Sequence, residues 1–179
     1  YMWQNKLTAT FEFLQIDHQH IEYFPFQHNE FRFIAFSSNV HLKSLCVDDL
    51  EQSSAAAAEA GFMTVQLNKY KASEIETMFQ TIRAGYGKEG SVIYYKNASG
   101  KVIGLVKKKT VWYIMVRAIR EKAKGYCGRV QTAGFSPEMI FNCKKKIRQM
   151  CNQKQQWLGF SDTCKQQWET LAGQFIEFL

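Results

Sequence analysis

The sequence has few of the features that are typical of membrane proteins, secreted proteins or proteins with a structural metal site. The 5 cysteines are odd in number and form no C-x-x-C pair, so there is no sign of a disulfide scaffold or a common zinc module. The longest apolar run, residues 111–116, is about a third of the roughly 20 residues that a membrane span needs. No signal peptide opens the chain. These absences predict an intracellular protein, cytoplasmic or nuclear, that does not act in a membrane.

The sequence does contain enough apolar residues for a core, and its charge is unevenly distributed. Of 179 residues, 46% are apolar and 15% aromatic, which suits one domain with or without an appendage. Residues 1–90 hold 7 Lys and Arg against 11 Asp and Glu, a net of −4, whereas residues 91–179 hold 16 against 5, a net of +11. A basic half of this kind favours a polyanionic partner, nucleic acid first and an anionic membrane surface second. A merely solvated basic face is the alternative.

Local patterns predict an α+β fold, mainly an antiparallel sheet with flanking helices, and a helical C-terminal appendage. Strands are predicted from β-branched and aromatic content at residues 8–16, 21–26, 31–36, 63–67, 91–96 and 101–108. The first three form a predicted antiparallel meander. Helices are predicted from spacing and caps at residues 47–60, after Ser73, at 111–124, after Ser136 and after Ser161. The expected division is a domain at 1–124, a glycine-containing linker at 125–135 and a helical domain at 136–179.

Three short segments carry side chains suited to chemistry. Glu12 lies between two phenylalanines of a predicted strand and therefore on the opposite face from both. Glu89 precedes a glycine at the start of another predicted strand, where a carboxylate can be presented to a ligand. Lys107 and Lys109 share one face of the next strand, and Lys108 points away. Taken singly, these residues also fit a solvated carboxylate, an ordinary turn and a charge run that protects a strand edge.

Together with the aromatic strand predicted at residues 31–36, these three segments resemble in order and spacing motifs III, IIIa, IV and V of the covalent nucleotidyltransferase superfamily of ligases and capping enzymes. The resemblance covers about residues 8–120. Lys107-x-Lys109 is followed at once by Trp112-Tyr113. That continuation is similar to the bacteriophage-type RNA ligase 1 branch, the tRNA-repair ligases.

The resemblance implies a partial nucleotidyltransferase domain, similar to the ATP-grasp-like ligases, that uses ATP and Mg²⁺ and acts on RNA, with tRNA as one candidate. No obligate protein partner is evident from the sequence. The implied site consists of Glu12 on the ribose or the reacting lysine, Phe33 or Phe36 stacked on adenine, Glu89 on the metal, and Lys107 and Lys109 on the phosphates. For the two phenylalanines, plain core packing is an equal alternative.

The family's nucleophilic lysine lies in a K-x-[DHN]-G motif, which does not occur in this chain. We therefore expect the chain to be the C-terminal part of a longer ligase and to be inactive alone. Lys144, Lys145, Lys146 and Arg148 are candidates for RNA contact in the helical tail, or else face water. A non-catalytic RNA-binding module is the main alternative function, and a DNA ligase or capping-type nucleotidyltransferase is another.

Overall fold

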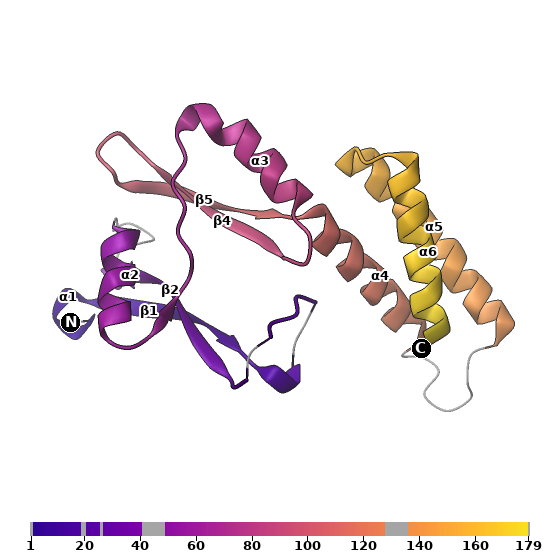
Figure 1. Cartoon of the computed structure of the whole chain (residues 1–179), viewed down its shortest axis with the longest axis horizontal. Coiled ribbons are helices and arrows are strands. Elements are labelled where there is room, and N and C mark those ends of the chain that lie inside the picture. The colour runs from indigo at the N-terminus through magenta and orange to yellow at the C-terminus, as the bar shows by residue number, and fades with distance from the viewer. Residues whose placement is uncertain (1, 19–20, 26, 41–48, 128–135, 179) are drawn as a thin grey trace. The chain divides into compact units, whose positions relative to one another are not determined.

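The computed structural model describes residues 2–18, 21–25, 27–40, 49–127 and 136–178 (Figure 1). The chain divides into two compact units. The first comprises Tyr1–Arg83 and Gly90–Lys108, and the second comprises Ala84–Glu89 and Lys109–Leu179.

The first unit is built on two antiparallel strands, β1 (Leu7–Leu14) and β2 (Glu30–Ser38). A short helix, α1 (Met2–Asn5), precedes β1, and a single 3₁₀ turn, Ile16–His18, follows it. The two-residue strand β3 (Met63–Thr64) pairs with β2 in parallel, so that the sheet order is β1-β2-β3.

A bulge in β2 decides which aromatic side chains enter the core. Thr10 pairs with Ala35 and Phe11 with Phe33, so Ile34 is the extra residue. Because side chains alternate along a strand, this extra residue brings Phe33 and Phe36 to the same side of β2. Their ring centroids lie 4.8 Å apart.

Helix α2 (Leu50–Glu59) closes this small core, with Ala57 packed in the same cluster as the two phenylalanines. Asp49 caps the helix by accepting hydrogen bonds from the backbone N–H groups of Glu51 and Gln52. The bond from Gln52 is the main reason that the pKa of Asp49 lies below its ordinary value.

The first unit also holds most of a two-stranded sheet and the helix before it. Strands β4 (Gly90–Lys96) and β5 (Val102–Lys109) are joined by a turn in which the Asn97 side chain accepts hydrogen bonds from the Ser99 and Lys101 backbone N–H groups. Helix α3 (Ile75–Ala84), which follows the 3₁₀ turn Ala72–Glu74, buries Met78.

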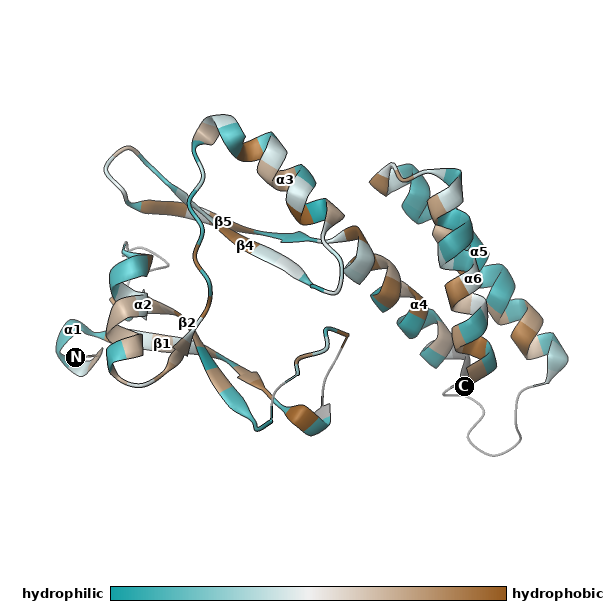
Figure 2. Ribbon diagram, in the orientation of Figure 1, coloured by the Kyte–Doolittle hydropathy of each residue, from teal (hydrophilic) through white to brown (hydrophobic). Residues whose placement is uncertain are grey.

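The second unit is helical and contains α4 (Val111–Cys127), α5 (Pro137–Leu158) and α6 (Asp162–Phe178). Figure 2 shows apolar and polar residues alternating along these helices, as expected for helices that bury one face. One buried cluster joins all three helices and consists of Met115, Ile119, Cys143, Ile147, Met150, Cys151, Ala172 and Ile176. Ser136 caps α5 through its hydroxyl, and Gly159 ends it in the left-handed conformation at φ 72°.

Much of the predicted secondary structure is confirmed, and so is the α+β class. The predicted strand at residues 21–26 is wrong for residues 21–25, which form no strand, whereas residue 26 lies outside the described part. Pro25 lacks the N–H that a central strand would donate, and β1 pairs with β2 instead. The predicted meander is therefore a two-stranded pairing extended by β3.

The division of the chain also differs from the predicted one. Helix α4 continues through Gly125 to Cys127, into the expected linker, and belongs to the same unit as α5 and α6. Residues 128–135 of that linker lie outside the described part. Among the described helices, none has the length and apolar character needed to cross a membrane.

Candidate functional site

The candidate site centres on an ion pair between two of the segments that the sequence singled out. The Lys109 ammonium donates a hydrogen bond to Glu89 Oε1 at 2.6 Å. Its Nζ also lies 4.4 Å from the centroid of the Tyr113 ring, within the range of a cation–π contact. Glu89 immediately precedes β4 and Lys109 ends β5. The two ends of a hairpin meet, which explains how residues 20 positions apart come into contact.

The pair is only partly buried, with 30% of the lysine side chain and 45% of the glutamate side chain exposed. An ion pair with this much solvent contact contributes about 0–1 kcal/mol to stability. Both charged groups can therefore exchange this contact for a ligand without a large loss of folding free energy.

Thr110 joins the two segments behind the ion pair. Its backbone N–H donates to the Glu89 carbonyl at 2.9 Å, and its buried hydroxyl donates to the Lys88 carbonyl at 2.7 Å. The same hydroxyl accepts a hydrogen bond from the Tyr113 backbone N–H at 2.9 Å. Thr110 is thus the N-cap of α4, and it fixes the Lys88–Glu89 backbone to the start of that helix.

Gly90 gives the Glu89 segment its path into β4. Its φ of 147° lies in a region that residues with a side chain rarely adopt. A glycine at position 90 is therefore a conformational requirement of this turn into β4.

The neighbouring lysines differ in their surroundings. Lys108 places its ammonium 4.1 Å from the centroid of the Phe79 ring on α3. Lys107 is exposed, and strand alternation puts it on the same face of β5 as Lys109. The distinct contacts of Lys108 and Lys109 agree with the predicted alternation.

Glu12 lies on the expected face of its strand. It is exposed and pairs across the strands with Arg32, whereas Phe11 and Phe13 pair with Phe33 and Phe31. Glu12 therefore lies on the face away from these rings. It belongs to the first unit and the Glu89–Lys109 pair to the second, so the convergence of Glu12 on that pair stays a prediction.

Phe33 and Phe36 are core residues. They are 1% and 6% exposed and pack with Ala57. Neither ring presents a face to solvent on which adenine could stack in this conformation. Core packing, the alternative, is the role that the structure shows for both.

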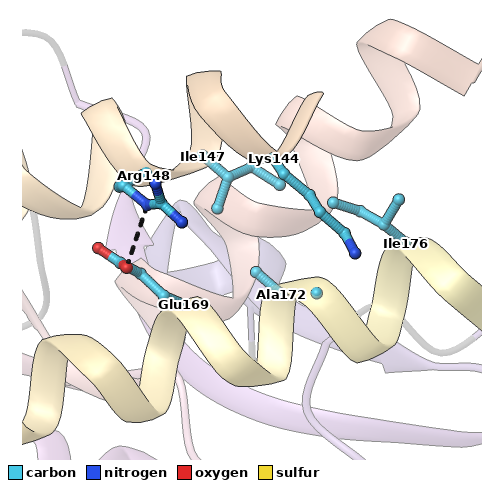
Figure 3. Close-up of a pocket in the computed structure, with 7 residues that line it drawn as sticks. Lys144, Ile147, Arg148, Glu169, Ala172 and Ile176 are labelled. Carbon is cyan, nitrogen blue, oxygen red and sulfur yellow. Dashed lines mark ion pairs between the residues drawn. The ribbon is translucent and has the colours of Figure 1, made fainter. Parts of the chain in front are cut away.

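The basic residues of the tail are divided between an interhelical surface and solvent. Lys144 bonds Glu177 at 2.8 Å and Arg148 pairs with Glu169 at 3.5 Å, while Lys145 and Lys146 are exposed. Figure 3 shows Arg148 and Glu169 facing each other from α5 and α6. Lys144 and Arg148 also line a shallow cavity of about 170 Å³ with Ile147, Glu169, Ala172, Gly173 and Ile176. These exposed ion pairs can be exchanged for a ligand in the same way as the Glu89–Lys109 pair, so RNA contact through the four basic residues stays a prediction.

Sequence reasoning missed two contributors to the site. Thr110 has the ordinary signal of an N-cap, a threonine directly before an apolar helical pattern. Tyr86, which lies between two glycines and contacts Trp112, has no comparable signal.

The donor set at the pair fits Mg²⁺ only in part. Glu89 would supply one hard carboxylate ligand, and the described residues contain no group of three or more His, Cys, Asp or Glu side chains that could hold a metal ion. Mg²⁺ is commonly held by one or two carboxylates together with substrate phosphates and water, and a single carboxylate is compatible with that arrangement.

Comparison of the chain with protein-family models, with curated proteins and with solved structures gave no match.

Proposed function

We propose that this chain carries the phosphate-binding part of an ATP-dependent RNA ligase. The observation that carries the proposal is the 2.6 Å contact between Glu89 and Lys109, since it joins two segments on which the family resemblance rests. Lys109 and Lys107 bind phosphate oxygens by charge, and Glu89 supplies a carboxylate ligand for Mg²⁺. Glu12 contacts the nucleotide ribose or orients the reacting lysine.

The chemistry of such a ligase suits a site made of positioned charges. A lysine amine first attacks the α-phosphate of ATP, and pyrophosphate leaves as the lysyl-AMP bond forms. The AMP group then passes from the lysine to the 5′-phosphate of RNA. An RNA 3′-hydroxyl then attacks that phosphate, the new phosphodiester forms and AMP leaves. Each step is a phosphoryl or nucleotidyl transfer, in which catalysis consists mainly of positioning and of neutralising charge on oxygens. Lys109 is suited to that task because Glu89 and Tyr113 both contact its ammonium.

The reaction needs a nucleophilic lysine, and this chain has no K-x-[DHN]-G motif. The residues described here therefore serve the binding of the nucleotide and the neutralisation of phosphate charge. We do not assign the lysine of the first step to any residue of this chain.

Binding of ATP with Mg²⁺, measured by calorimetry on four proteins, tests the proposal. Lys109→Ala should weaken binding about tenfold or more, because a hydrogen bond to a charged group contributes about 1.5–3 kcal/mol. Lys107→Ala should weaken it to a smaller extent. Lys108→Ala is the matched control, because its ammonium lies over Phe79. Equal losses for Lys108→Ala and Lys109→Ala would contradict the proposal, and so would the absence of binding to the unmodified chain.

A further inference from the structure

Two aromatic rings in contact, the exposed Tyr86 and the partly buried Trp112, lie on the same two segments as the Glu89–Lys109 pair. The ring centroids of Tyr86 and Trp112 are 5.5 Å apart, and their planes are inclined at 57°. Tyr86 is 82% exposed and lies between Gly85 and Gly87, of which the second has a φ of 69°. A ring so exposed adds little to a hydrophobic core, because the free energy of burial scales with the apolar area removed from water.

The aromatic pair and the ion pair belong to one continuous arrangement within the second unit. Residues 86–89 and 109–112 are joined by contacts at both ends. At one end the Glu89 carboxylate meets Lys109, and at the other the Tyr86 ring meets Trp112. Between these contacts, Thr110 bonds to the carbonyls of residues 88 and 89. A flat ring surface and a phosphate-binding ammonium are therefore held by the same two short segments.

This juxtaposition matches the two parts of a nucleotide. Ammonium groups bind phosphate oxygens, and nucleobases stack on exposed aromatic rings with little preference for one base over another. The exposed Lys88 adds a second cation to the same segment. Phe33 and Phe36, in contrast, are buried in the core and offer no such surface.

We propose that Tyr86 and Trp112 form the stacking surface for the nucleobase of the phosphate-bearing ligand. This inference rests on the proposed function, because it assumes that Lys109 binds the phosphate of the same ligand. The base belongs either to ATP or to a terminal nucleotide of RNA, and the ligand panel below separates the two sources.

Binding is measured for three ligands: inorganic tripolyphosphate, ATP and a 5′-phosphorylated single-stranded RNA oligonucleotide. Tyr86→Ala should weaken binding of ATP or of the RNA about tenfold and change tripolyphosphate binding by less than twofold. A tenfold loss corresponds to about 1.4 kcal/mol and lies within the range measured for base–aromatic stacking. A loss for ATP alone identifies adenine as the base, and a loss for RNA alone identifies the RNA end.

Two further variants keep the test selective. Tyr86→Phe retains the ring and should bind all three ligands as the unmodified chain does. Tyr70→Ala removes another exposed tyrosine, which lies in the first unit, and should have no effect. Thermal unfolding of each variant verifies that the fold is retained, as expected for substitutions of exposed side chains.

The outcomes separate this inference from the proposed function. If Lys109→Ala weakens tripolyphosphate binding while Tyr86→Ala leaves all three ligands unaffected, the stacking inference is overturned and the phosphate site stands. If Tyr86→Ala weakens the binding of tripolyphosphate as much as that of ATP and RNA, the inference is also overturned, because tripolyphosphate has no base that could stack on the ring. If the unmodified chain binds none of the three ligands, both proposals fail.

Discussion

Replacing Thr110 with valine should both destabilise the helical unit and disturb the candidate site. Valine has nearly the same shape as threonine but can neither donate to the Lys88 carbonyl nor accept from the Tyr113 N–H. Loss of an N-cap costs about 0.5–2 kcal/mol, and loss of a hydroxyl–carbonyl hydrogen bond costs about 0.5–1.5 kcal/mol. The two bonds share one oxygen and are not independent, so we expect a total of about 1–3 kcal/mol.

Urea unfolding, followed by the circular dichroism of the helices, measures this loss. Thr170→Val is the matched control: its hydroxyl donates to the Gln166 carbonyl at 2.9 Å within α6, a type of bond that adds little to helix stability. We expect the control to change the free energy of unfolding by less than about 0.5 kcal/mol.

A binding measurement shows whether Thr110 also positions the site. Thr110→Ser keeps both hydrogen bonds and loses one methyl group, so it should retain most of the affinity for ATP, whereas Thr110→Val should lose it. If Thr110→Val is as stable as Thr170→Val, the cap does not have the energetic role assigned here. If Thr110→Val is destabilised but binds ATP normally, Thr110 stabilises α4 without positioning Glu89 and Lys109.

Three other predictions follow from particular residues. Gly90→Ala should lower the free energy of unfolding in the same urea titration by about 1–3 kcal/mol, because alanine rarely adopts the φ of 147° found there. Gly104→Ala on β5 is the control and should be neutral or slightly stabilising, because φ is not positive there and an added Cβ meets no atom within 4 Å. Burial raises the pKa of the Cys151 thiol from 9.0 to about 11, so between these pH values the unfolded chain loses a proton that the folded chain keeps. The free energy of unfolding should therefore fall with rising pH more steeply in the unmodified chain than in Cys151→Ala. Incubation with ATP and Mg²⁺ should leave the intact mass of the chain unchanged, since the K-x-[DHN]-G motif is absent; a stable gain of one adenylyl group would show that another nucleophile acts.

Features encoded by neighbouring residues could be predicted from the sequence. Asn97 and Gly100 are typical turn residues and lie between the two predicted strands that became β4 and β5, and Ser136 predicts the start of α5. Each acts on backbone groups within a few positions. The alternation of Lys107, Lys108 and Lys109 depends only on strand geometry.

Features that depend on distant partners could not be predicted. The residues at 21–25 have the composition of a strand but no partner strand, because β1 pairs with β2. The helical pattern at residues 111–124 does not indicate which helices cover its apolar face, whereas in the structure Met115 and Ile119 pack with residues of α5 and α6.

In the candidate site, too, features encoded by neighbouring residues could be predicted and features that depend on distant partners could not. Glu89 and Lys109 were identified by the segments in which they lie, and the hairpin explains their contact. The core positions of Phe33 and Phe36 depend on a bulge at Ile34, for which the sequence has no clear signal. The contact between Tyr86 and Trp112 depends on the conformation of a glycine-containing loop, and composition alone does not specify it.

The most direct test of the central claim is the effect of Mg²⁺ on ATP binding by the unmodified chain and by Glu89→Gln. If Glu89 provides a carboxylate ligand for the metal of a ligase site, Mg²⁺ should strengthen ATP binding to the unmodified chain, and Glu89→Gln should remove that gain. In a charge-only RNA-binding module, Glu89 merely competes with the ligand for Lys109. Glu89→Gln would then tighten ATP binding with or without Mg²⁺, and Mg²⁺ would weaken binding by neutralising the phosphates. The first result is the one we predict, and the second would contradict the ligase proposal.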